Sequence, residues 1–128
     1  MDNLTSKEEA IMQILWDLKR AMVKDIMDKL QNSRQPYTTV SSIVRILEKK
    51  GFVSHKAYGK THEYFPLISK AEYRRRKFRG LLTEYFDNSI ESMVSFLVKE
   101  EKVKPEEIEE LTRMITKESE NTKQNDYD

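Results

Sequence analysis

The chain contains one predicted β-hairpin, and three amphipathic helices are predicted ahead of it. Residues 52–57 and 62–67 have the composition of short strands, and Gly59 lies in the turn between them. Only 3 Gly and 3 Pro occur in 128 residues, which excludes a fold with many hairpins or long loops. The predicted fold class is therefore mostly α with a small β-hairpin.

Apolar side chains recur at helical spacing in three segments before the hairpin. The first covers about residues 6–19 and the second about residues 23–32. The third is expected to begin at a cap formed by Thr38 or Thr39 and to end before Gly51. This order of elements is typical of a winged helix-turn-helix, in which the third helix enters the DNA major groove and the hairpin forms the wing.

Three regions follow from this pattern. We expect the winged helix DNA-binding domain to cover residues 1–69. A capping box at Ser69–Glu72 then begins a long helix, and residues 70–117 predict a helical dimerisation domain. The polar residues 118–128 predict a disordered tail.

The charge is balanced over the whole chain but not along it. Lys and Arg number 23 and Asp and Glu 22, which gives a net charge of +1. Residues 31–64, however, carry six basic and two acidic side chains. This local excess indicates a polyanion partner for the first half of the chain. The alternative is that these basic side chains simply face solvent and that their excess arose by chance.

Several classes of protein are excluded by composition. The sequence has no Cys, so disulfides, thiol catalysis and Cys-based metal sites are excluded. No apolar run approaches the length of a membrane span, and the acidic, polar N-terminus does not resemble a signal peptide. We therefore expect a soluble, intracellular protein without membrane insertion, and no cofactor is expected.

The face of the third helix opposite its apolar positions offers groups suited to DNA. Hydroxyls there can bond to phosphates or base edges, and Arg45 is the one side chain able to make a bidentate contact to guanine. The wing adds cations for phosphates and an aromatic ring for the backbone, although such residues also occur at hairpin tips merely for solubility. The predicted DNA contacts are Thr38, Thr39, Ser41, Ser42, Arg45, Lys49, Lys56, Tyr58, Lys60 and Thr61.

The region after the hairpin carries more apolar side chains than a winged domain of this size can cover. Two-fold pairing with a second copy would bury them symmetrically, and the alternative is that they fold back onto their own winged domain. The residues predicted for dimerisation are Tyr73, Phe78, Leu81, Leu82, Tyr85, Phe86, Ile90, Met93, Val94, Leu97, Ile108, Leu111 and Ile115.

Several short stretches occur in an order typical of one family of regulators. They are Leu4-Thr5 with Glu8-Glu9, Ile14-Leu15-Trp16, Tyr37-Thr38-Thr39-Val40, Leu47-Glu48-Lys49-Lys50-Gly51-Phe52-Val53 and Tyr64-Phe65-Pro66-Leu67. Through them the chain resembles, over about residues 4–117, the BlaI/MecI penicillinase-repressor family, which is also grouped with the copper-responsive CopY repressors. The resemblance implies a cytoplasmic homodimeric repressor that binds a palindromic double-stranded DNA operator and is relieved by proteolysis in its C-terminal helices. It also implies a membrane-bound sensor metallopeptidase as a partner.

Two features depart from the family pattern. Copper-type members carry a cluster of cysteines near the C-terminus, so copper sensing is not expected here. Beta-lactam-type members are cut at an Asn-Phe bond, and alignment on residues 107–111 places Phe96 and Leu97 at that position. The Phe96–Leu97 bond is thus the candidate cleavage site, and the departure leaves two interpretations: altered protease specificity, or no proteolytic control.

Other chemistry is weakly indicated. His55 and His62 lie on facing strands, but two imidazoles without further ligands do not define a metal site. No Ser-His-Asp set, phosphate loop or buried carboxylate pair is visible in the sequence, so an enzyme is not expected. The rival to a DNA-binding protein is a winged-helix protein-interaction module whose third helix does not contact DNA.

Overall fold

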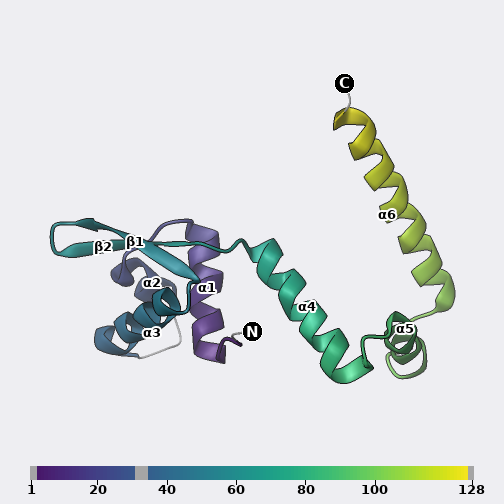
Figure 1. Ribbon diagram of the computed structural model, residues 1–128, viewed down its shortest axis with the longest axis horizontal. Helices are drawn as coiled ribbons and strands as arrows, with labels where there is room; N and C mark the ends of the chain where they lie inside the picture. The colour runs from purple at the N-terminus through teal and green to yellow at the C-terminus, as the bar shows by residue number, and fades with distance from the viewer. Residues whose placement is uncertain (1–2, 31–34, 127–128) are drawn as a thin grey trace. The chain divides into compact units, whose positions relative to one another are not determined.

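The computed structural model describes residues 3–30 and 35–126. Within them the chain forms helices and one antiparallel two-stranded sheet, which confirms the predicted fold class (Figure 1). It divides into two compact units, Met1–Arg76 and Lys77–Asp128, so the boundary falls inside a helix rather than before residue 70. The elements are α1 (Ser6–Leu18), α2 (Val23–Lys29), α3 (Tyr37–Lys49), β1 (Val53–Tyr58), β2 (Thr61–Pro66), α4 (Lys70–Phe86), α5 (Ile90–Lys99) and α6 (Pro105–Asp126).

The first unit is organised around the apolar face of α3. Val40, Val44 and Leu47 are completely buried, as their spacing predicts, and α3 contacts α1, α2 and β1. Ile11 and Leu15 of α1 belong to the same core, whereas Ile43 of α3 is only partly buried. This packing fixes the rotation of α3 about its axis, and hence the side chains that it presents to solvent.

The hairpin is attached to the helices at its base. Ala21, in the connection between α1 and α2, exchanges two backbone hydrogen bonds with Tyr64 of β2, at 2.9 and 2.7 Å. Tyr64 is also buried, with 3% of its surface exposed. Toward the tip the strands are exposed, and Gly59 adopts a left-handed φ of 64° that suits glycine in a tight turn.

The ends of two helices differ from the prediction. The α3 helix begins at Tyr37, with Pro36 at the N-cap position and no side-chain cap, so Thr38 and Thr39 lie inside its first turn and do not cap it. The Pro36 carbonyl accepts the first hydrogen bonds of the helix, from the Thr39 and Val40 amides at 3.0 and 3.2 Å. The α2 helix ends at Lys29 rather than near residue 32. Residues 31–34, where the turn was predicted to begin, lie outside the described residues.

The second unit contains the end of α4 and the helices α5 and α6. Asp87 and Asn88 have left-handed φ values of 51° and 58° and separate α4 from α5. Ser89 then caps α5, because its side chain accepts a hydrogen bond from the Ser92 amide at 3.0 Å. The α6 helix continues to Asp126, over residues for which a disordered tail was predicted, and the sequence offers no Pro or Gly after Pro105 to end it. Residues 127–128 of that tail lie outside the described residues.

A buried ion pair joins the start of α1 to the end of α3. Thr5 and Glu8 form a capping box at the start of α1, with the Glu8 carboxylate accepting from the Thr5 amide at 2.8 Å. The same carboxylate accepts from Lys50 Nζ at 2.9 and 3.1 Å. Burial alone would raise the pKa of Glu8, but the hydrogen bonds from Thr5 and the charge of Lys50 outweigh it and lower the pKa.

Replacing Lys50 by Met keeps most of the apolar stem and removes the ammonium. We expect Lys50→Met to lower the free energy of unfolding at pH 7 by about 1.5–3 kcal/mol, because a buried carboxylate loses a charged hydrogen-bond donor. The neighbouring exposed Lys49→Met is the matched control, with an expected change of less than about 0.5 kcal/mol.

The effect of Lys50→Met should depend on pH. A carboxyl whose pKa is lowered by folding stabilises the native state above its unfolded pKa, here 4.5, and that contribution disappears as the pH falls through the lower folded value. The difference between wild type and Lys50→Met should therefore narrow as the pH falls below 4.5. Urea unfolding at a series of pH values measures it, and a pH-independent difference would contradict this role for Glu8.

Candidate nucleic-acid interface

The exposed face of α3 carries a polar stripe along the helix. Thr38, Ser42, Arg45 and Lys49 are all exposed, at spacings of four, three and four residues, which places them on one side of the helix. We call these four residues the α3 stripe. Two other predicted contacts, Thr39 and Ser41, are partly buried and lie beside it.

Sequence reasoning missed two apolar side chains exposed on the same helix. Tyr37 is 57% exposed at the first position of α3, and Ile46 is 47% exposed between Arg45 and the buried Leu47. The signal for Ile46 was available, because a residue one position before Leu47 falls away from the apolar face of a helix. Apolar groups at such positions can contact the methyl group of thymine.

The strand register divides the wing residues between its two faces. His55 pairs with Tyr64, Lys56 with Glu63, and Ala57 with His62, so alternate pairs share a face. Lys56 and Glu63 therefore lie on the face opposite to that of Tyr64.

The predicted contacts of the wing lie on that second face and at the tip. The Lys56 Nζ lies 5.4 Å from the centroid of the Tyr58 ring. Tyr58 and Thr61 form the last pair of the ladder, and Lys60 lies in the turn between them. Together with Lys56, these three side chains are exposed.

The other face of the wing contacts α3 through polar groups. Glu48 and Arg45 of α3 lie close enough to Tyr64 for their charges to act on its phenol. Burial raises the pKa of the Tyr64 phenol, the charge of Glu48 raises it further, and Arg45 acts in the opposite direction. A guanidinium has five N–H donors, so Arg45 can bind a ligand such as a base edge from this exposed position.

A second polar contact joins α3 to β1. His55 Nδ1 lies 2.6 Å from Glu48 Oε2, and both side chains are 31% exposed. The imidazole of His55 stacks on that of His62, with ring centroids 4.2 Å apart and an angle of 13° between the planes. Sequence reasoning placed the two histidines near each other, but it did not anticipate Glu48.

Residues 74–77 of α4 form a basic run, and an acidic residue of the same helix partly neutralises its charge. The Glu72 carboxylate lies 2.8 Å from Arg75 Nη2 and 3.3 Å from Arg76 Nε, at helical spacings of three and four residues. These exposed pairs contribute little to stability.

Tyr73, predicted to contribute to dimerisation, lies elsewhere. Its ring is 8% exposed and packs 5.4 Å from Trp16 and 6.2 Å from Phe52, centroid to centroid. It therefore belongs to the core of the first unit, because the first turns of α4 fold against that core. The Trp16 indole also donates to the Ile68 carbonyl at 2.9 Å, in the segment that leads into α4.

Most of the other side chains predicted for dimerisation are not fully covered within the chain. Leu82 is buried, whereas Phe86, Met93, Val94, Leu97 and Ile108 are partly buried. The large exposed members of the set are Phe78, Leu81, Tyr85, Ile90, Leu111 and Ile115, to which the structure adds Met114.

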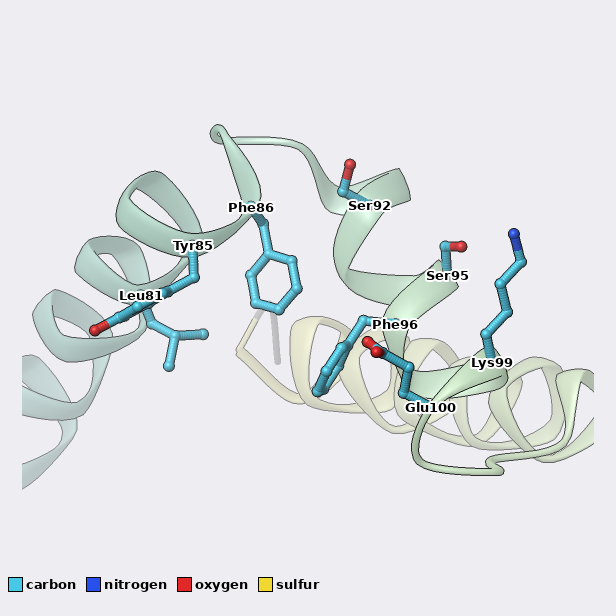
Figure 2. Close-up of a pocket in the computed structure, with 8 residues that line it drawn as sticks. All are labelled: Leu81, Tyr85, Phe86, Ser92, Ser95, Phe96, Lys99 and Glu100. Carbon is cyan, nitrogen blue, oxygen red and sulfur yellow. The ribbon is translucent and has the colours of Figure 1, made fainter.

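A groove of about 740 Å³ opens between α4 and α5 in the second unit. Its apolar floor includes Phe86 and Phe96, whose rings meet edge to face with centroids 5.5 Å apart (Figure 2). The Phe96–Leu97 peptide bond lies inside α5, three residues before its end at Lys99. Residues lining the groove are Leu81, Tyr85, Phe86, Ser92, Ser95, Phe96, Lys99 and Glu100.

Neither a metal cluster nor a membrane-spanning helix is found in the part of the chain that the structure describes. Among those residues, no three His, Asp or Glu side chains are placed to hold a metal ion. The helices there are also too short or too polar to cross a bilayer.

The arrangement of α1–α3 and the hairpin defines a winged helix-turn-helix. The solution structure of the DNA-binding domain of the repressor BlaI has this fold too, with a TM-score of 0.50 and 22% identity over 56% of this chain and 88% of that domain. The sequence pattern of the penicillinase repressor family matches residues 4–117, and the chain belongs to this family. It is a DNA-binding repressor and not an enzyme.

Two relatives extend over nearly the whole chain. The methicillin resistance regulatory protein MecI of Mammaliicoccus sciuri is 28% identical over 122 residues, which span 91% of this chain and 99% of that protein. The penicillinase repressor of Bacillus licheniformis is 23% identical over 114 residues, or 88% of each chain.

Proposed function

We propose that the protein is a cytoplasmic homodimeric repressor that binds a palindromic operator through α3 and the wing. The observation that carries the proposal is the α3 stripe, which is polar, exposed and backed by three fully buried side chains. A helix held this rigidly can present a fixed set of groups to the major groove. In the proposed complex, the hydroxyls of Thr38 and Ser42 approach the backbone closely, and Arg45 reads a base.

The wing supplies the electrostatic part of the interaction. Lys60 at the tip and Lys56 on one face are exposed cations that can neutralise phosphates, and Tyr58 can lie along the sugar–phosphate backbone. Contacts of this kind bind all sequences alike, whereas Arg45 would distinguish guanine from the other bases.

The proposed dimer rests on the second unit. Leu111, Met114 and Ile115 are 56%, 60% and 64% exposed on one side of α6, which is more apolar surface than a monomer normally leaves in water. Pairing with a second copy buries this surface and links two winged domains, so that both half-sites of a palindrome are engaged at once.

We also propose that proteolysis relieves repression, and that a membrane-bound sensor metallopeptidase triggers the cut. The Phe96–Leu97 bond lies in a ten-residue helix that has no fully buried side chain, so local unfolding of α5 costs little and exposes the bond. The first unit keeps its own core after the cut, whereas the end of α5 and the whole of α6, which carries the exposed apolar face proposed to pair, are separated from it.

The role of Arg45 can be tested by substitution. We expect Arg45→Ala to weaken operator binding by about 1–3 kcal/mol and to relax the preference at one base per half-site, because a bidentate contact is lost. Lys60→Ala should weaken binding equally on all sequences and reduce the slope of log K against log salt by about 0.9 for each lost phosphate contact.

A mobility-shift titration on the promoter of the protein's own operon, at several salt concentrations, measures both effects. Lys104→Ala, an exposed cation in the second unit, is the charge-matched control and should leave binding within about twofold. If Arg45→Ala changes neither affinity nor sequence preference, the base-reading role is wrong. If neither variant matters, the protein-interaction module becomes the better description.

Dimerisation can be tested on α6. The double variant Leu111→Glu/Ile115→Glu places charges in the exposed apolar face, and we expect it to sediment as a monomer and to lose the affinity gained from the second half-site. The double variant Thr112→Glu/Thr116→Glu adds the same charge at the same spacing on the polar side and should remain a dimer. A wild-type chain that is monomeric while bound tightly to a single half-site would refute the proposed assembly.

The proteolytic switch predicts a fragment that ends near Phe96. In cells exposed to cell-wall stress, this fragment should appear on an immunoblot together with derepression of the target genes. Persistence of the full-length protein while those genes are transcribed would exclude the switch and would point to a ligand or partner that acts on the intact dimer.

A further inference from the structure

We propose that Ile46 of α3 is a specificity-determining residue that contacts the C5 methyl group of a thymine in the major groove. The inference rests on the proposed binding of DNA by α3 and the wing. It adds an apolar contact to an interface described so far by its polar groups, and it assigns the ligand as the one methyl group that a DNA base presents in that groove.

The exposed large apolar side chains of the first unit lie mainly on the elements proposed to contact DNA. Among the described residues of that unit, they are Tyr37 and Ile46 on α3, Tyr58 at the end of β1, and Leu67 just after β2. Two of the four are tyrosines, whose hydroxyls suit solvent. Ile46 is thus the one purely aliphatic member on α3, and it is 47% exposed although the same helix buries three other side chains completely.

Helical geometry places Ile46 at the margin of the α3 stripe. With about 100° of rotation per residue, Ile46 lies about 40° from Ser42 and about 60° from Lys49 around the helix axis. It is at least about 100° away from each of the three buried side chains, and Arg45 lies on the opposite margin of the stripe. The stripe therefore has a guanidinium on one margin and an aliphatic side chain on the other.

The stability of the helix does not account for an isoleucine at this position. Half of the side chain remains in water, and a β-branched residue is a weaker helix former than alanine, leucine or lysine. The same branching favours binding, because an isoleucine in a helix has essentially one χ1 rotamer and loses little freedom when a contact forms. The properties of Ile46 thus suit contact with a partner better than they suit folding.

Thymine is the base that such a side chain can recognise. In the major groove the other three bases present only hydrogen-bonding groups, which an isoleucine cannot use, whereas thymine adds its C5 methyl. Consecutive Cα atoms are about 3.8 Å apart and base pairs are stacked about 3.4 Å apart. The thymine therefore lies within about two base pairs of the guanine proposed for Arg45, and the two side chains read two positions of each half-site.

A uracil scan isolates this contact, because uracil differs from thymine only by the missing methyl. The full-length protein is titrated in a mobility shift against the promoter duplex of its own operon, in which single thymines are replaced by uracil in turn. We expect replacement of one thymine per half-site to weaken binding about fourfold, the factor for one buried methyl group. That thymine should lie within about two base pairs of the position whose preference Arg45→Ala relaxes.

The variant Ile46→Ala removes the same contact from the protein side. It should weaken binding to the thymine duplex and abolish the difference between the thymine and uracil duplexes, so the two changes are not additive. Lys49→Ala, in the neighbouring turn of the stripe, is the matched control. It should weaken binding to both duplexes equally and leave the difference of about fourfold between them. Ile46→Val, which is shorter by one carbon, should reduce that difference and replaces Ile46→Ala if circular dichroism shows the latter to be unfolded.

Two results would overturn the inference. One is equal binding of the wild-type protein to all the uracil duplexes, and the other is an unchanged uracil difference in a folded Ile46 variant. Either result leaves the proposed function standing as long as the wild-type protein binds its promoter with the expected dependence on salt. Undetectable or salt-independent binding of the wild-type protein would overturn the proposed function, and this inference with it.

Discussion

Val40, Val44 and Leu47 are completely buried beneath α3, and the orientation of that helix depends on their burial. Each of these side chains contributes about 1.5–3 kcal/mol to the stability of the folded state when it is fully buried. A rotation of the helix that exposed even one of them would therefore be costly. The burial of these side chains also determines the direction in which the α3 stripe points. The surface available to DNA is therefore determined by the core of the first unit, and core substitutions far from DNA should alter recognition.

The local parts of this fold could be predicted from the sequence. Helical spacing identified the buried face of α3, and the position of Gly59 identified the turn of the hairpin. Both features depend only on residues that are close together in the sequence, so the sequence pattern reveals them. The start of α3 was harder to predict, because its N-cap residue is Pro36, whose side chain has no hydrogen-bonding group, so the usual polar cap residue is missing from the sequence.

Contacts between distant segments could not be predicted in this way. Glu8 and Lys50 are 42 residues apart, and their pairing depends on how α1 packs against the end of α3. The link between Glu48 and His55 likewise depends on where β1 begins relative to α3. Tyr73 was misplaced for a similar reason, since helical spacing alone does not reveal that the first turns of α4 pack against Trp16 and Phe52.

The backbone bridge between Ala21 and Tyr64 attaches the base of the wing to the helices. That base is held by two hydrogen bonds and a buried ring, whereas the residues around the tip, Lys60 included, are exposed and are joined to the helices only through the strands. A displacement of the tip would therefore move the helices little. In the proposed complex, the wing would adjust to the DNA backbone without changing how the α3 stripe is presented.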